Sequence, residues 1–203
     1  GLPIIDTFHK LVESGDRVLR IEGCTSGTLG FLLDHVSQGR PFSEALRKAM
    51  AHGYTEPDPR DDLSGMDVAR KALILARLIG FEGELKDIPV ESLVPESLRS
   101  VGRDEFLQRI GELDAAWATR GALSHEKGEV WRYVAKVARK RVSVTLARVT
   151  SASPFAALRG TDNQVVFTTT RYRENPLVIT GPGAGPQVTA AGVLNDVLKL
   201  AMT

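Results

Sequence analysis

The stretch from Gly53 to Lys71, which reads GYTEPDPRDDLSGMDVARK, holds the side chains best suited to chemistry. Its carboxylates fall within twelve positions and belong to Glu56, Asp58, Asp61, Asp62 and Asp67. Two prolines, at positions 57 and 59, stiffen this loop and hold the acids in place. Carboxylates held in this way suit a substrate that carries an ammonium group.

Lys71 lies four residues after Asp67, which predicts that both side chains share one face of a helix over residues 68–79. The neighbours of Lys71 are apolar, so we expect this helix to be buried on more than one side. A buried lysine is costly without a partner. Burial also favours the neutral amine, which could accept a proton. The alternative is a solvated acidic loop followed by an ordinary helical ion pair.

Other candidate residues give weaker signals. The run Gly181-Pro-Gly-Ala-Gly185 lies between a predicted strand and a predicted helix, where backbone amides could meet a phosphate or ribose. It could equally be a tight turn that uses glycine for positive φ. No βαβ unit surrounds it, so it is not a complete dinucleotide fingerprint. The histidines lack metal-ligand spacing, and we expect no metal site.

Composition narrows the class of protein. The 203 residues include 26 basic and 25 acidic side chains, a net charge of +1 that gives no electrostatic case for a nucleic-acid or membrane partner. Cys24 is the only cysteine, which fits a reducing compartment, and we expect a cytoplasmic protein. The chain begins with Gly1-Leu-Pro-Ile-Ile and has no initiator Met. We therefore expect a piece of a longer protein.

The order of the predicted elements indicates the fold class. Helical periodicity marks residues 4–13, 26–36, 43–51, 68–79 with Asp67 as the cap, 104–126 and 186–201; residues 53–66 read as a loop. Alternating or apolar runs mark strands at 17–21, 129–138, 141–149, 163–170 and 177–179. Helices followed by sequential strands predict an α+β fold with a mostly antiparallel or mixed sheet and helices packed on one face.

The acidic loop and its lysine resemble the catalytic region of homoserine dehydrogenases. The resemblance extends to Glu22-Gly-Cys-Thr-Ser-Gly-Thr28, to Asn175-Pro-Leu177 and to Gly181-Pro-Gly-Ala-Gly-Pro-Gln-Val-Thr-Ala-Ala-Gly192, and is weakest between about 84 and 165. Residues 11–16 and 128–133 look closest to the bifunctional aspartokinase–homoserine dehydrogenases. The resemblance implies that residues 1–203 form a catalytic domain for substrate binding and dimerisation.

By that resemblance, the reaction interconverts L-homoserine and L-aspartate 4-semialdehyde with NADP or NAD, a step toward threonine and methionine. Lys71 matches the catalytic lysine, Glu56 and Asp67 match the residues that bind homoserine, and Asp62 would support them. Gly53 and Gly185 match positions that contact the cofactor.

The resemblance also sets expectations about partners. The nucleotide-binding half of the family would precede Gly1, so we expect helix 186–201 to pack toward it and the isolated chain to be inactive. We expect a homodimer, and the open edges of the sheet suggest association through Val137, Val142, Val144 and Leu146.

Two alternatives from other classes stay open at the level of sequence. In a metal-dependent hydrolase or phosphotransferase, Asp58, Asp61 and Asp62 would hold Mg²⁺. That interpretation leaves Lys71 and its apolar helix without a role. The chain could also be a non-catalytic amino-acid-binding or dimerisation module of a larger enzyme.

Overall fold

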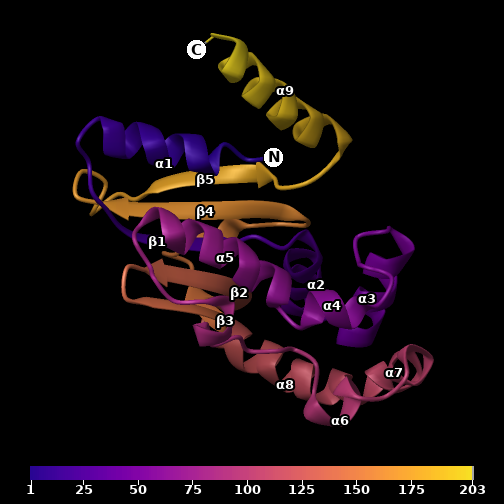
Figure 1. Ribbon diagram of the computed structural model, residues 1–203. Helices are drawn as coiled ribbons and strands as arrows, with labels where there is room; N and C mark the ends of the chain where they lie inside the picture. The colour runs from indigo at the N-terminus through magenta and orange to yellow at the C-terminus, as the bar shows by residue number, and fades with distance from the viewer. Residues whose placement is uncertain (203) are drawn as a thin grey trace.

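Five strands form one sheet in the order β3-β2-β1-β4-β5 (Figure 1). They are β1 (Val18–Cys24), β2 (Glu129–Ala138), β3 (Arg141–Thr150), β4 (Asp162–Thr169) and β5 (Leu177–Pro182). All neighbouring pairs are antiparallel. The computed structural model describes residues 1–202. The prediction of an α+β fold with a mostly antiparallel sheet is confirmed.

The helices come before β2 and after β5, with only a 3₁₀ turn between the later strands. The α-helices are α1 (Ile4–Glu13), α2 (Gly27–Ser37), α3 (Phe42–Ala51), α4 (Pro59–Leu63), α5 (Met66–Leu78), α6 (Glu96–Arg99), α7 (Arg103–Arg109), α8 (Asp114–His125) and α9 (Pro186–Met202). The 3₁₀ turns are η1 (Leu85–Asp87), η2 (Ile110–Leu113) and η3 (Pro154–Ala157). Most predicted helices and strands therefore lie within a few residues of their predicted bounds.

The main core lies between one face of the sheet and helices α1, α2, α5 and α8. Alternate residues of the strands, such as Ile21, Val144 and Phe167, point to these helices and are fully buried. The helices pack apolar side chains against this face, for example Leu29 and Leu32 of α2. The expectation that helices pack on one face of the sheet is confirmed.

The opposite face of the sheet carries a smaller apolar cluster under η3. Phe155 and Leu158 cover Cys24, whose thiol is buried, and burial raises its pKa to about 12. The guanidinium of buried Arg132 donates to the carbonyl oxygens of Phe155 and Leu158, at 2.9 Å each. Cys24 is therefore a packed residue of this cluster without the lowered pKa of a reactive thiol.

Three expectations about local structure were wrong. The loop over 53–66 contains helix α4, which Asp58 begins by accepting a hydrogen bond from the Arg60 amide at 3.0 Å. Asp67 does not cap α5, because Gly65 takes the N-cap position and Asp67 lies in the first turn. The helix predicted over 104–126 is divided into α7, η2 and α8, with Gly111 in the 3₁₀ turn.

The predicted association of β2 and β3 through Val137, Val142, Val144 and Leu146 was wrong for the three valines; Leu146 is half-buried against the same core. Val137, Val142 and Val144 are at most 2% exposed because they face the helices of their own chain. The outer edge of β3 is partly paired: the Val144 amide donates to Pro89 O, and the Glu91 amide donates to Val144 O, both at 2.9 Å. This edge is therefore not a free apolar strand.

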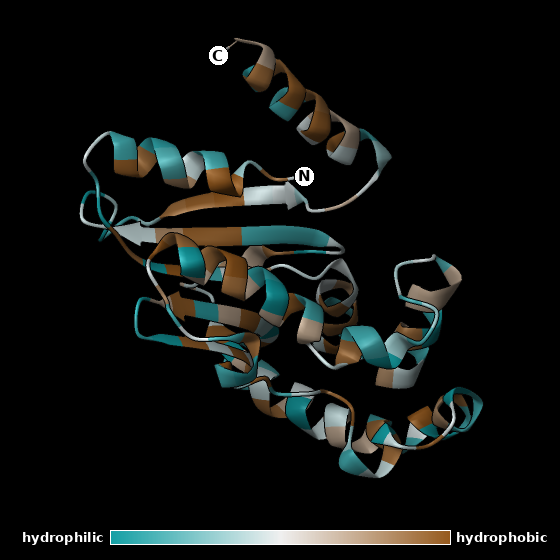
Figure 2. Cartoon of the chain, in the orientation of Figure 1, coloured by the Kyte–Doolittle hydropathy of each residue, from teal (hydrophilic) through white to brown (hydrophobic). Residues whose placement is uncertain are grey.

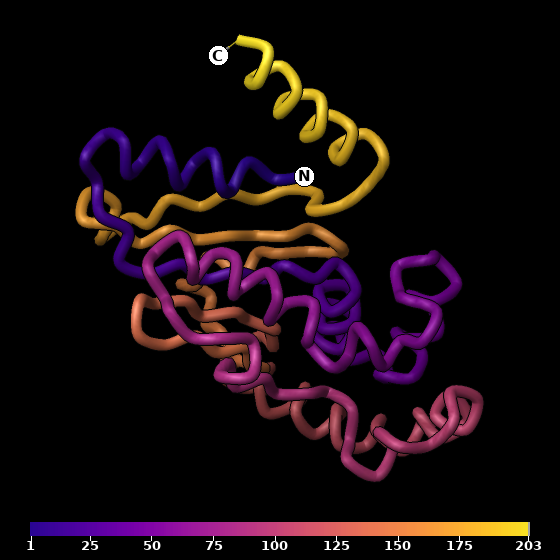
Figure 3. The backbone as a smooth tube through the Cα atoms, viewed as in Figure 1, coloured from indigo at the N-terminus to yellow at the C-terminus, as the bar shows by residue number. Residues whose placement is uncertain are grey.

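Helix α9 leaves the body of the domain after β5 (Figures 1 and 3). None of its described side chains is buried, and Val193, Leu194, Val197 and Leu198 are each more than half exposed. In Figure 2 much of the ribbon of this helix has the brown colour of hydrophobic residues. An ion pair from Lys199 to Asp6 on α1 ties it to the rest of the chain, at 2.5 Å.

Candidate active site

Lys71 and Asp67 form an ion pair on one face of α5. The Lys71 Nζ atom lies 2.6 Å from Asp67 Oδ2 and donates to the carbonyl oxygen of Thr25 at 3.0 Å. Thr25 directly follows β1, so the amine is held at the end of the central strand. The predicted pairing is present, and the end of strand β1 adds a second contact that fixes the direction of the lysine.

The expectation that Lys71 is buried was wrong. Its side chain is 44% exposed, and that of Asp67 is 59% exposed. The buried face of α5 consists of Val68, Ala69, Ala72, Leu75 and Ala76, and the apolar neighbour Ile74 points outward. The apolar residues thus form one stripe, and Lys71 lies at its border with access to solvent and to a ligand.

Gly65 and Tyr133 fix the point at which α5 begins. Gly65 has a φ of +75°, in the left-handed region that favours glycine, and a Cβ atom there would lie 1.8 Å from the Tyr133 hydroxyl oxygen. Tyr133 donates that hydroxyl to Glu91 O at 2.6 Å, and burial raises its pKa. Strand β2 therefore sets the start of the helix that carries Asp67 and Lys71.

Asp62 organises the acidic loop. Its Oδ2 atom accepts the Glu56 amide at 2.8 Å, and its Oδ1 atom lies 2.9 Å from the hydroxyl of Thr28 on α2. The same hydroxyl lies 2.5 Å from the carbonyl oxygen of Tyr54 and can donate to either acceptor. Both carboxylate oxygens of Asp62 thus lie within hydrogen-bond distance of donors of the protein itself.

Asp58 has a structural partner as well. Its carboxylate accepts from the guanidinium of Arg60, with a shortest distance of 2.6 Å, and this hydrogen bond lowers the pKa of Asp58. Arg60 in turn donates to Val101 O at 2.5 Å. Asp58 and Asp62 are therefore engaged in hydrogen bonds within the protein. They are two of the three carboxylates that the Mg²⁺ alternative requires as ligands.

Two depressions adjoin the Lys71–Asp67 pair. The first has a volume of about 460 Å³, and its lining combines the four carboxylates of Glu56, Asp61, Asp62 and Asp67 with one guanidinium, that of Arg70. The second has a volume of about 210 Å³ and is mostly apolar, with Lys71 in its wall. The ion pair therefore lies between an acidic depression that suits a cationic group and an apolar depression that suits an apolar group. The Lys71 amine lines the apolar depression.

The two predicted cofactor glycines lie in different surroundings. Gly53 ends α3 with a φ of +69°, and its amide donates to Met50 O at 3.0 Å. Gly185 has a φ of +137° and directly precedes α9. Both backbones are open to approach, since a Cβ atom would meet nothing within 4 Å at Gly53 and only Val188 at 3.8 Å at Gly185.

Sequence reasoning did not single out Thr25, Thr28, Asn163 or Tyr133. Thr25 and Thr28 belong to the Gly-Cys-Thr-Ser-Gly-Thr run, whose position directly after a strand was a usable signal. Asn163, which lines the apolar depression, and Tyr133 come from β4 and β2, far along the chain. Only the antiparallel register brings them to the site, and the sequence gives no local sign of that.

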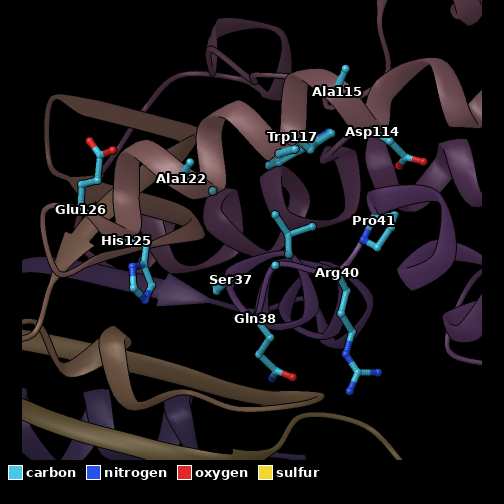
Figure 4. Close-up of a pocket in the computed structure, with 14 residues that line it drawn as sticks. Ser37, Gln38, Arg40, Pro41, Asp114, Ala115, Trp117, Ala122, His125 and Glu126 are labelled. Carbon is cyan, nitrogen blue, oxygen red and sulfur yellow. The ribbon is translucent and has the colours of Figure 1, made fainter.

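Another cavity lies away from this site. It has a volume of about 820 Å³ and opens between α8 and the loop after α2, with Trp117, His125 and Arg40 in its wall (Figure 4). The Asp114 carboxylate at its margin already accepts the amide and hydroxyl of Ser43, at 2.8 and 2.7 Å. No lysine–carboxylate pair lines it, so we place the chemistry at Lys71 and not here.

Across residues 1–202, no three side chains of His, Cys, Asp or Glu are grouped in a way that could hold a metal ion. Within the same residues, no helix combines the length and apolar character needed to cross a bilayer.

Comparisons with known proteins agree with the site. The family model for homoserine dehydrogenase matches residues 3–198. A maize protein named bifunctional aspartokinase/homoserine dehydrogenase 2, chloroplastic, is 50% identical over 99% of this chain and 22% of its own length. A Candida auris crystal structure titled as a protein of unknown function is 45% identical, with a TM-score of 0.93 over 100% of this chain and 58% of that one. A hyperthermophilic archaeal homoserine dehydrogenase solved with NADPH is 27% identical, with a TM-score of 0.71 over 100% of this chain and 53% of that one.

The fold and the site define a class of protein: an α+β domain that presents a lysine–carboxylate pair between an acidic and an apolar depression. The chain belongs to the homoserine dehydrogenase family. It spans only about a fifth of the maize protein and somewhat more than half of the two solved chains.

Proposed function

We propose that the chain is the catalytic, substrate-binding part of an oxidoreductase that interconverts L-homoserine and L-aspartate 4-semialdehyde. The observation that carries this proposal is the position of Lys71, paired with Asp67 between the two depressions. An ammonium group fits the acidic depression, and an apolar ring fits the apolar depression. Family membership supports the same reaction.

The side chains have distinct roles in this proposal. Glu56 and Asp67 bind the ammonium group of the substrate, because they line the acidic depression. Asp62 supports them by holding the Glu56 amide and the hydroxyl of Thr28. During reduction of the aldehyde, Lys71 donates a proton to the oxygen as negative charge develops on it. In the reverse direction, the Lys71 amine accepts the proton of the homoserine hydroxyl.

The cofactor is a nicotinamide dinucleotide, either NADP or NAD, and it supplies or accepts the hydride. The NADPH complex of the archaeal relative supports the class of cofactor. We propose that the backbones at Gly53 and Gly185 approach it. Most of its binding site lies in a nucleotide-binding region outside these residues, against which the exposed apolar face of α9 packs.

We propose that the protein acts as a homodimer, with the partner subunit on the face of the sheet opposite the main core. Residues that point to that side include Arg20, Lys136, Thr168 and the exposed Val178. A bifunctional parent with an aspartokinase region is the proposed context, supported by the maize relative. The cytoplasm is the proposed compartment.

The proposal is tested by homoserine-dependent reduction of NADP⁺ or NAD⁺ in the whole protein that contains this chain. We expect turnover with L-homoserine and none with N-acetyl-L-homoserine, since acetylation removes the ammonium charge that Glu56 and Asp67 bind. The 203-residue chain alone should fold and show no turnover, because positioning of the ring depends on the nucleotide-binding region. Absence of homoserine oxidation by the folded whole protein would refute the proposed function.

A further inference from the structure

We propose that Asn163 is a binding residue for the nicotinamide ring: its side-chain oxygen accepts a hydrogen bond from the carboxamide N–H of a ring seated in the apolar depression beside Lys71. This inference rests on the proposed function and deepens it. It assigns the depression of about 210 Å³ to one part of the cofactor and names the residue that orients it.

The first observation is an unpaired acceptor. Asn163 Oδ1 is buried and has no hydrogen-bond partner among the described residues, and the same is true of Thr25 Oγ1. Both residues line the depression that contains Lys71. Buried polar atoms are nearly always paired, so two orphan oxygens at the wall of one cavity indicate a missing donor.

The second observation is how the carboxamide of Asn163 is held. A Cβ atom on Gly183 would lie 1.8 Å from Asn163 Nδ2, so the amide packs in the space where a side chain at 183 would be. The pairing of β4 with β5 places Asn163 opposite Gly181, two residues before this contact. The terminal torsion of asparagine is soft, so rotation about it can turn the oxygen to the depression.

The third observation is the apolar character of the remaining wall. Leu2, Ile4, Ile5, Ile74 and Leu75 contribute to it, and Ile5 and Ile74 are 45% and 54% exposed. Exposed isoleucines beside a lysine suit the face of a planar heteroaromatic ring, which they would remove from water. Homoserine lacks such a face, and its ammonium group is served by the acidic depression on the other side of the ion pair.

The arrangement has a chemical consequence. A ring oriented by Asn163 on one side and a substrate held by Glu56 on the other would meet at the Lys71–Asp67 pair. The proton of Lys71 and the reacting carbon of the ring would then reach the same carbonyl group. Asn163 thereby fixes which atoms of the cofactor face the substrate.

The test measures dissociation constants by calorimetry in the whole protein. The probes are NADP⁺ and NAD⁺, each with its 3-acetylpyridine analogue, in which a methyl group replaces the carboxamide NH₂. ADP-ribose, which lacks the ring, is the ligand control. The variants are Asn163→Leu and Asn163→Ala, and Asn175→Leu on an exposed loop is the matched control.

We expect the wild type to bind the natural dinucleotide about fivefold more tightly than its acetylpyridine analogue, the factor that corresponds to one ordinary hydrogen bond. Asn163→Leu should bind the natural dinucleotide and the analogue with equal affinity, weaker than that of the wild type for the natural dinucleotide. It should bind ADP-ribose as tightly as the wild type does. Asn163→Ala, which adds no bulk, gives the same comparison if the leucine variant fails to fold.

An unchanged preference in a folded Asn163 variant, or no preference in the wild type, would overturn the inference. In either case, retained oxidation of homoserine by the wild type would leave the proposed function standing. A wild-type protein that neither binds dinucleotide nor oxidises homoserine would instead refute the proposed function itself.

Discussion

The hydroxyl oxygen of Tyr133 occupies the space beside Gly65, 1.8 Å from where a Cβ atom at position 65 would lie. This contact joins the central part of β2 to the N-cap residue of α5. Because Asp67 and Lys71 follow within two turns, the direction of both side chains depends on it. A residue of the sheet and a glycine of the loop thus position the chemistry without taking part in it.

Replacing Gly65 should therefore harm both stability and activity. Gly65→Ala adds strain at positive φ and forces the alanine Cβ against Tyr133, so we expect it to lower the free energy of unfolding by about 2–4 kcal/mol. Gly128→Ala is the control, because Gly128 also has positive φ and a Cβ atom there meets nothing within 4 Å. Equal losses in the two variants, measured by denaturant unfolding, would show that the Tyr133 contact has no effect.

Glu56 should distinguish substrate binding from cofactor binding. Glu56→Gln keeps the shape of the side chain and removes its charge, so it should raise KM for homoserine by about tenfold. The dissociation constant for the dinucleotide should stay within about twofold of the wild type. An equal loss of both affinities, measured by steady-state kinetics and calorimetry, would mean that the loop has a structural role and not a substrate-specific one.

Asp62 should act through the loop. Asp62→Ala removes the acceptor for the Glu56 amide and for the Thr28 hydroxyl, so the loop should lose its fixed shape. We expect a rise in KM for homoserine and faster hydrogen exchange at the Glu56 amide. Thr28→Val is the partner variant and should give a smaller effect of the same kind. Unchanged exchange at Glu56 in Asp62→Ala would contradict this role.

Asp16 should make the stability of the fold depend on acid pH. Its burial alone would raise its pKa, but hydrogen bonds from the Thr170 and Thr169 hydroxyls and from the amides of Arg17 and Arg171 together lower it to about 2. The pKa in the folded protein is thus below the unfolded value of about 3.9. The stabilisation is complete above about pH 4 and is lost as the pH falls toward about 2.

Asp16→Asn should accordingly be less stable than the wild type at pH 6, and the difference should shrink between about pH 4 and pH 2. Unfolding free energies measured across this range test the prediction. Asp104→Asn, at an exposed position on α7, is the control and should show no such trend. A constant difference between Asp16→Asn and the wild type down to pH 2 would contradict the assignment.

Local patterns predicted most of the fold. The alternation in residues 129–138 and 141–149 predicted strands with nearly the observed bounds. It marks these strands because the side chains on one side of each strand are more buried than those on the other. The same alternation could not say which side of the sheet the helices cover. Val142 and Val144 therefore looked free to associate, whereas they lie in the core. Helix α4 was missed because its five residues are too few to show a period.

The site was only partly accessible to sequence reasoning. The spacing of Asp67 and Lys71 predicted their ion pair, since both lie on one helix. The exposure of Lys71 could not be inferred, because it depends on how wide a stripe of α5 the sheet covers. The contacts of Lys71 with Thr25 O and of Tyr133 with Gly65 join residues more than 40 positions apart, and only the assembled fold brings them together.

Lys71 is proposed to transfer the proton during interconversion of homoserine and its aldehyde. The most direct measurement is kcat of the whole protein with Lys71→Met, compared with Lys48→Met, which changes an exposed lysine on α3. Lys71→Met should lower kcat by at least ~100-fold, the usual scale for loss of general acid–base catalysis, with the fold intact. Lys48→Met should match the wild type. A Lys71→Met variant that folds and retains a near-normal kcat would contradict the account.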